Sequence, residues 1–303
     1  MLEDYINALR AGQRATRAAQ ARGQSPYLAV LDDILRGVNI VAQEPLGLVD
    51  IPAESIVGTK TAGRHTAFAP NFMPILEVDS EFARKWSNLC DAHLEEGIRN
   101  PVTAYEYLNK FYVEEGNKRV SVLKYYEAVK IPGTVTRLVP ERNETLENKI
   151  YYEFLDFYKF SKINYVHFSR LGGYAKLQTL VCKATGESWT DDDRLNFASL
   201  YTMFSQQFYA LGGSALGLTP GDALLVYLAV YRYSDAIEST PAQVRENLSK
   251  LWDEIKILTR PQAVELQLEP ATKQGAEPLL SKLNIFSPRP SELRVVFLHE
   301  HNA

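Results

Sequence analysis

The sequence predicts an α+β fold in which a small mixed-sheet domain is followed by an all-helical domain. Strand-type and helix-type patterns alternate over residues 46–142, which is typical of a sheet covered by helices. Residues 145–260 are helical in pattern, and eighteen of the 33 aromatic residues fall between positions 151 and 233. Aromatic stripes of this kind predict a buried core. Five prolines between residues 261 and 293 indicate a linker within the last segment, 261–303.

The composition excludes several classes of protein. The 303 residues are 46% hydrophobic and 23% charged, as in ordinary globular proteins. A net charge of −4 argues against coating nucleic acid through overall charge, although residues 110–142 carry seven basic and only four acidic side chains. Cys90 and Cys182 lack zinc-site or disulfide spacing and fit a reducing compartment. Without a signal peptide or a long apolar run, we expect a cytoplasmic protein with no membrane insertion.

The N-terminal segment, residues 1–45, is predicted to be a helical extension. Apolar residues at helical spacing indicate a first helix over residues 2–22. Ser25 and Pro26 then predict a second helix, as its N-cap and its first helical residue. Residues 46–58 read as extended segments interrupted by a proline, and they open the sheet domain.

Clear start and stop signals define a helix in the sheet domain. Ser80 is a good N-cap and Gly97 a good terminator for a helix over residues 81–96, with Leu94 on its inner face. Ile131-Pro132-Gly133 is expected to break a later helix. The remaining elements are predicted in this order: strand 101–105, strand 110–114, helix 119–129 and strand 134–139.

Two features of the helical domain leave alternatives open. The acidic run Thr190-Asp191-Asp192-Asp193 could recruit a cation, but it also fits a capped first helical turn matched to the helix dipole. Residues 169–184 could act as a DNA-recognition helix or form a plain packing hairpin. We expect this domain to offer a surface for a protein partner or a homodimer.

The turn from Glu114 to Arg119 is the most informative stretch of the sequence. It joins a strand pattern to a helix pattern and contains Gly116, whose small size lets backbone amides approach an anion. Lys118 and Arg119 add positive charge. If a helix begins just after the glycine, its free N–H groups and its dipole point toward the same anion. The alternative is that the glycine serves only as a turn in a charged loop.

Residues 46–140 resemble the ParB/sulfiredoxin-like fold. Members of that family carry an acidic residue, a glycine, two variable positions and an arginine at the start of a helix, matched here by Glu115-Gly116-Asn117-Lys118-Arg119. The flanking order also matches: a helix ending at Gly97, a strand beginning Pro101-Val102, and the Ile131-Pro132-Gly133 turn. The resemblance implies a site for the phosphates of CTP or ATP, with Mg²⁺ as the expected companion of the nucleotide.

Carried over by position, the resemblance implies that Gly116, Asn117, Lys118 and Arg119 bind the nucleotide, with Arg64 as a further ligand from an upstream loop. Sulfiredoxins have their catalytic cysteine where this chain has Asn117, so that chemistry is not expected. Some relatives transfer or hydrolyse phosphate. If this chain does so, Glu114 or Glu115 is the candidate catalytic base. No metal site built from protein side chains is predicted.

The last residues suggest a further domain. Leu293-Arg294-Val295-Val296-Phe297-Leu298 reads as a buried strand and resembles the first strand of the basic-membrane-protein-type (BMP) substrate-binding domain of ABC transporters. That resemblance implies a C-terminal domain for small ligands. His299 and His301 could chelate a metal, although a solvated pair is the commoner outcome.

The sequence therefore predicts a bacterial nucleotide-binding regulatory module of the ParB/sulfiredoxin-like type, coupled to the helical domain. Three alternatives stay open at this point. The protein could be a nucleotide hydrolase or phosphotransferase, a partition-like DNA-binding protein, or a purely structural scaffold. DNA is the less favoured partner because the whole chain is acidic.

Overall fold

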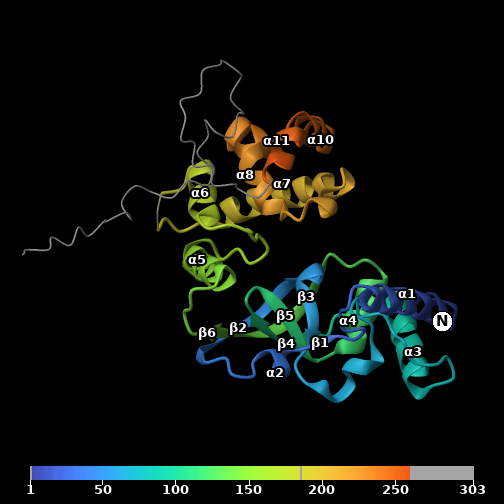
Figure 1. Cartoon of the computed structure of the whole chain (residues 1–303). Helices are drawn as coiled ribbons and strands as arrows, with labels where there is room; N and C mark the ends of the chain where they lie inside the picture. The colour runs from blue at the N-terminus through green and yellow to red at the C-terminus, as the bar shows by residue number, and fades with distance from the viewer. Residues whose placement is uncertain (1, 185, 260–303) are drawn as a thin grey trace, which may run out of the picture. The chain divides into compact units, whose positions relative to one another are not determined.

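A computed structural model describes residues 2–184 and 186–259 of the chain. The chain divides into two compact units, Met1–Asn143 and Glu144–Ala303. The first contains a six-stranded mixed sheet with helices, and the elements described in the second are all helical (Figure 1). The predicted α+β class is therefore confirmed. The predicted linker and terminal strand, 261–303, lie outside the described residues.

The sheet of the first unit has the strand order β1-β3-β5-β4-β6-β2. Neighbours β1/β3, β3/β5 and β4/β6 run parallel, whereas β4/β5 and β2/β6 run antiparallel. Leu108 and Asn109 join β4 to β5 with positive φ angles of 51° and 62°, as a tight hairpin turn requires. The strands are β1 (Ala29–Val30), β2 (Ile40–Pro52), β3 (Ile56–Thr59), β4 (Val102–Tyr107), β5 (Lys110–Glu115) and β6 (Lys130–Pro140).

Three helices of the first unit, α1, α3 and α4, lie together beside the sheet (Figure 1). Helix α1 contacts α3, and α3 contacts α4. Buried side chains from all three, including Tyr5, Trp86 and Val122, form one apolar cluster, and the Trp86 indole N–H donates to Ser121 Oγ at 2.8 Å. The helical elements are α1 (Leu2–Ala21), α2 (Leu31–Ile34), η1 (Ala53–Ser55), η2 (Ala62–Ala67), α3 (Glu81–Glu96) and α4 (Asn117–Tyr125).

Several predicted boundaries are confirmed. Ser80 caps α3 by accepting the Ala83 N–H at 3.1 Å, and Gly97 follows the last helical residue. The helix predicted over residues 2–22 is α1. These signals are reliable because a cap satisfies backbone groups within a few residues of itself.

Other expectations are wrong. Ser25 and Pro26 start no helix, and the chain instead reaches β1, so residues 1–45 contribute strands to the sheet as well as helix. Helix α4 runs over Asn117–Tyr125 rather than 119–129, and Ile131-Pro132-Gly133 lies inside β6, paired with β2. Leu94 is 58% exposed. In both strand segments, hydrogen bonding to strands that are distant in sequence outweighs the local preference for a helix start or a turn. A short stretch of sequence does not contain these partners.

The second unit buries most of its aromatic residues, as predicted, although Tyr209 is 41% exposed. Phe154, Phe157, Tyr174, Phe197 and Phe204 are each at most 3% exposed, and neighbouring rings lie in edge-on or tilted contact. Its elements are α5 (Leu146–Ser161), α6 (Gly173–Leu180), α7 (Asp191–Ala210), η3 (Gly213–Leu216), α8 (Pro220–Val230), α9 (Tyr233–Ile237), α10 (Pro241–Lys250) and α11 (Trp252–Ile257).

The geometry of residues 169–184 disfavours a recognition helix. Within this segment only α6 is helical, and its buried face includes Tyr174 and Leu177. The next helix, α7, begins only at Asp191, whereas a helix-turn-helix uses a turn of three or four residues. With one helix, the segment is not a two-helix hairpin either; α6 instead packs against α5 and α8. Over the described residues, no helix has both the length and the apolar character needed to cross a bilayer.

Candidate functional site

The turn between β5 and α4 requires a glycine. Gly116 has a φ of 108°, a left-handed conformation that side chains with a Cβ disfavour. A Cβ built at this position would lie 2.8 Å from Val102 Cγ1 and 3.1 Å from Arg119 Nε. The backbone conformation and the lack of space thus both select glycine, so Gly116 brings the end of the strand close to the start of the helix.

The first turn of α4 has no side-chain cap. Its first intrahelical bond runs from the Val120 N–H to the Gly116 carbonyl at 3.0 Å. The three preceding amides, from Asn117 to Arg119, have no carbonyl available within the helix, as at every helix start. They also carry the positive end of the helix dipole. An anion near Gly116 would meet both features at once.

Asn117 does not cap its own helix. Its side-chain Nδ2 donates to Thr59 Oγ1 at 3.2 Å, and that hydroxyl donates to the Val113 carbonyl at 2.9 Å. The Oδ1 atom of Asn117 is buried and accepts no hydrogen bond from the described residues. Asn117 therefore links the start of α4 to β3 through a hydrogen bond. Its Oδ1 atom can still accept a hydrogen bond beside the turn.

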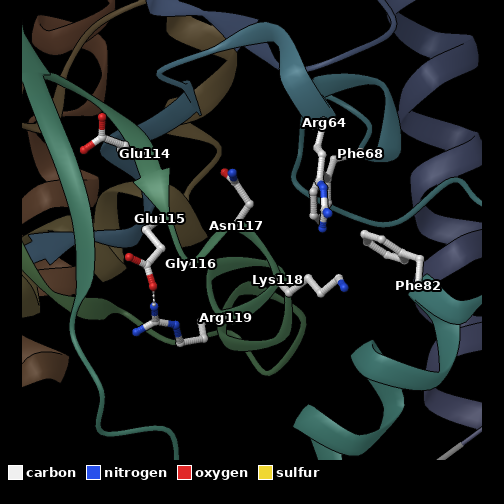
Figure 2. A pocket seen from close by; sticks show the side chains of 9 residues that line it. All are labelled: Arg64, Phe68, Phe82, Glu114, Glu115, Gly116, Asn117, Lys118 and Arg119. Atoms are coloured by element: carbon white, nitrogen blue, oxygen red, sulfur yellow. Dashed lines mark hydrogen bonds and ion pairs between the residues drawn. The ribbon is translucent and has the colours of Figure 1, made fainter.

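A pocket of about 340 Å³ opens beside this turn (Figure 2). The structure brings all seven predicted site residues to its wall, although Arg64 lies far from the others in sequence. Sequence reasoning missed Phe68 and Phe82, which complete the lining. The spacing of Phe82 indicates only the inner face of a helix, and no local signal marks Phe68. The predicted lining residues are Arg64, Glu114, Glu115, Gly116, Asn117, Lys118 and Arg119.

Lys118 and Arg64 are the cations available to a ligand in this pocket. Figure 2 shows the Lys118 side chain extending toward Phe82, with the Arg64 guanidinium on the same side of the pocket. The Lys118 Nζ lies 4.6 Å from the centre of the Phe82 ring, and neither cation forms an ion pair with a described residue. Burial, followed by the nearby charges of Lys85 and Arg64, lowers the pKa of Lys118. A bound anion would relieve this repulsion.

Arg119 is already engaged within the protein. Its guanidinium donates to the carbonyl of Asn100 at 2.9 Å and to that of Pro101 at 2.6 Å. The Glu115 carboxylate lies 3.4 Å away, and the Arg119 side chain is only 19% exposed. Arg119 therefore fixes the segment that leads into β4. The predicted contact of Arg119 with phosphate would require N–H groups that already donate to the Asn100 and Pro101 carbonyls.

The two glutamates occupy a different side of the site from Lys118 and Arg64. Both are exposed, and Figure 2 shows Glu114 on β5 pointing away from the two cations, while Glu115 faces Arg119. Over residues 2–184 and 186–259, no group of three or more His, Cys, Asp or Glu side chains is placed to hold a metal ion. Any Mg²⁺ here would depend mainly on ligands from phosphate oxygens.

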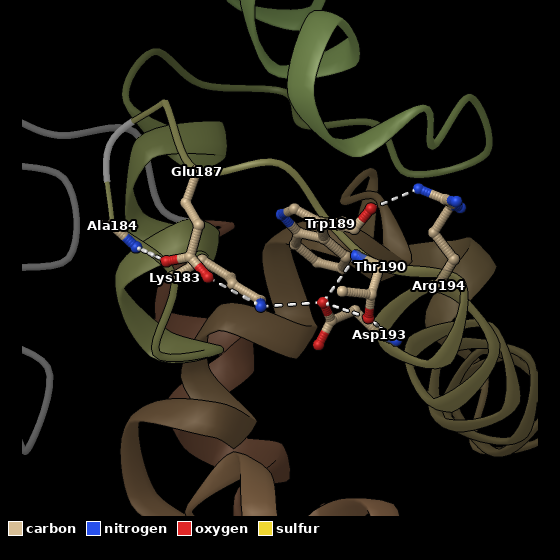
Figure 3. A network of polar contacts seen from close by, with 7 residues as sticks. All are labelled: Lys183, Ala184, Glu187, Trp189, Thr190, Asp193 and Arg194. Carbon is tan, nitrogen blue, oxygen red and sulfur yellow. Dashed lines mark hydrogen bonds and ion pairs between the residues drawn. The ribbon is translucent and has the colours of Figure 1, made fainter.

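The acidic run forms the N-cap and the first turn of α7. Thr190 and Asp193 form a reciprocal capping box, and Asp193 also accepts a hydrogen bond from Lys183 Nζ at 2.8 Å (Figure 3). The hydrogen bond from Lys183 is the largest cause that lowers the pKa of Asp193 to about 2. Arg194 pairs with Asp191. Protein cations thus neutralise two carboxylates of the run, which supports the capping alternative over a cation site.

Comparison with known proteins does not assign the chain to a family. No family model matches the sequence, and no curated protein matches it significantly. The resemblance to the ParB/sulfiredoxin-like fold therefore stays a prediction, and the interpretation of the pocket depends on its own residues.

Proposed function

We propose that the first unit binds the phosphate groups of a nucleotide, CTP or ATP, in the pocket at the start of α4. In this proposal it acts as a regulatory module of the ParB/sulfiredoxin-like type. One observation carries the proposal: an uncapped helix start borders the same pocket as Lys118 and Arg64, two cations that form no ion pair within the described part of the chain. Both features attract anions, and phosphate is the anion that helix starts most often bind.

Each group has a separate task in this proposal. The amides that follow Gly116 donate to phosphate oxygens. Lys118 on α4 and Arg64 on η2 neutralise the negative charge of the phosphate. Phe82 and Phe68 form an apolar wall that keeps water from one side of Lys118. Arg119 is a positioning residue, because its bonds to the Asn100 and Pro101 carbonyls hold the turn in place.

The arrangement also suggests how binding could regulate the protein. Arg64 belongs to η2, Phe82 to α3, and Lys118 to α4. A phosphate bound by the two cations would join η2 to α4, beside the Phe82 ring of α3. The nucleotide would then stabilise one arrangement of these elements, and the helical unit or a C-terminal ligand-binding domain would respond to it.

We do not extend the proposal to hydrolysis or phosphotransfer. A general base must lie within hydrogen-bond reach of the proton that it removes. Glu114 points away from the cations, and Glu115 faces Arg119 rather than the space between Lys118 and Arg64. No contact in this pocket favours DNA over a small phosphate ligand.

Isothermal titration calorimetry with CTP, ATP, CDP and ADP, each with Mg²⁺, tests the proposal. We expect the Lys118→Met variant to bind roughly 10- to 150-fold more weakly, since a hydrogen bond to a charged group contributes about 1.5–3 kcal/mol. The matched control is Lys159→Met, which removes the same charge from an exposed lysine of the second unit that is paired with Asp156. Folded protein that binds none of the four nucleotides would refute the proposal.

A further inference from the structure

A second pocket, of about 440 Å³, lies at the opposite end of α4 from the proposed nucleotide site. It is bordered by the last turn of α4, by α1, by η1 and by the loop that follows η2. Lys124 is the only lysine or arginine in its lining, which also includes two glutamates. The lining residues are Ala11, Ala53, Glu54, Asn71, Met73, Lys124, Tyr125, Glu127 and Ala128.

The Lys124 amine is held in an unusual environment. Its Nζ donates to the Ile56 carbonyl at 2.8 Å and lies 5.1 Å from the centre of the Phe72 ring. Lys124 forms no ion pair with any residue in the described part of the chain. An ammonium group has three donors, so this environment satisfies it only partly. Phe72 itself has a φ of 66°, which is uncommon for a bulky residue and marks a constrained backbone beside the amine.

This environment makes Lys124 a better nucleophile than an exposed lysine. Burial lowers its pKa to about 8, while the charge of Glu54 acts in the opposite direction. About a tenth of the amine is then neutral at pH 7, against roughly one part in 2,500 for an unperturbed lysine. Desolvated lysines of this kind react with carbonyl compounds.

The charges around the pocket restrict which compounds can react there. Glu54, Glu127 and the phenol of Tyr125 are the other titratable groups of its lining. The lining itself thus supplies more carboxylates than amines. Phosphorylated or carboxylated reagents are therefore repelled, whereas small uncharged carbonyl compounds are not.

We propose that Lys124 is a reactive lysine that forms an imine with small uncharged aldehydes in this pocket. The neutral amine adds to the carbonyl carbon to give a carbinolamine. The former carbonyl oxygen then leaves as water with two protons, which derive from the original amine after exchange with solvent, and a C=N bond replaces the C–N single bond. No oxidant, reductant or second protein is needed, and water reverses the reaction.

Reductive trapping tests this inference. The full-length protein is incubated at pH 7 with propanal and cyanoborohydride, which reduces the imine to a stable secondary amine, and labelling at each lysine is followed by peptide mass spectrometry. We expect Lys124 to react at least about tenfold faster than the exposed Lys85, because of its larger neutral fraction. The rate at Lys124 should level off above about pH 8.

Two comparisons separate a reactive pocket from general lysine chemistry. With glyoxylate, an anionic aldehyde, the labelling ratio of Lys124 to Lys85 should fall severalfold. In the Lys124→Met variant the rapidly labelled peptide should disappear while Lys85 labelling is unchanged. Equal labelling of Lys124 and Lys85 by propanal at pH 7 would overturn the inference, and this comparison within the unmodified chain stands even if the variant fails to fold.

Discussion

Replacing Gly116 by alanine tests the turn on which the proposed site depends. Two costs add at this position. A left-handed backbone costs a residue with a Cβ about 1–2 kcal/mol, and crowding in a packed site adds about 1–3 kcal/mol. The crowding is specific, because the new Cβ would meet Val102 Cγ1 at 2.8 Å and the Arg119 guanidinium at 3.1–3.2 Å. We therefore expect Gly116→Ala to lower the unfolding free energy of the first unit by about 2–5 kcal/mol.

Gly212→Ala is the matched control for the backbone cost. Gly212 has nearly the same conformation, with φ 89° and ψ 21° against 108° and 19° for Gly116, and it also precedes a helical turn. A Cβ at Gly212 would meet no atom within 4 Å. We expect this variant to destabilise the second unit by only about 1–2 kcal/mol.

Hydrogen exchange in graded urea, read by mass spectrometry, measures both variants. Peptides over residues 100–125 report on the first unit, and peptides over residues 200–225 report on the second. Each unit is thus followed separately, so the comparison does not assume that the whole chain unfolds in one step. If the loss at Gly116 is no larger than the loss at Gly212, then crowding against Val102 and Arg119 does not select this glycine, and the reasoning about the turn is wrong.

Three further predictions concern buried or paired ionisable groups. Both ring nitrogens of His167 are buried with no hydrogen-bond partner among residues 2–184 and 186–259, and burial lowers the pKa of this side chain to about 4. The unfolded chain therefore binds the proton more readily, so thermal stability should fall as the pH drops from about 6.5 to about 4, and it should fall less in His167→Phe. The hydrogen bond from Lys183 chiefly lowers the pKa of Asp193 to about 2. The charged carboxylate therefore stabilises the folded state above about pH 4, and this stabilisation is lost toward pH 2. Urea unfolding at neutral pH should show that Asp193→Asn lowers the unfolding free energy by about 0.5–1 kcal/mol. Glu106→Gln removes the carboxylate 2.5 Å from the buried Arg137 guanidinium, and urea unfolding should show a loss of about 3–5 kcal/mol. A smaller loss in a Glu106→Leu/Arg137→Met double variant would identify the broken ion pair as the cause.

Short-range signals explain which parts of the fold could be predicted. Ser80 and Thr190 cap helices that begin at the next residue, and Gly97 ends one, as their local sequences indicate. Such signals depend on backbone groups within about four positions, so a short window contains all the interacting partners. The glycine turn before α4 belongs to the same class, because it joins adjacent elements and its backbone conformation is a local property.

Long-range contacts explain where the predictions failed. Pro26 fits a helix start by every local rule, yet the chain after it pairs with β3 as a strand. The Ile131-Pro132-Gly133 segment looks like a break, yet it lies in β6 between β2 and β4. In both cases the stabilising partner is distant in sequence, and its hydrogen bonds outweigh the local preference.

The sequence by itself determined that this chain has a glycine turn flanked by cations at the start of a helix, and an aromatic helical unit after it. Only the tertiary structure decided which cations face the pocket. It brings Arg64 and Phe82 to Lys118, and it commits Arg119 to the carbonyls of Asn100 and Pro101. The physical reason is that backbone conformation follows neighbouring residues, whereas the partner of a long charged side chain depends on which distant segments the fold places within its reach.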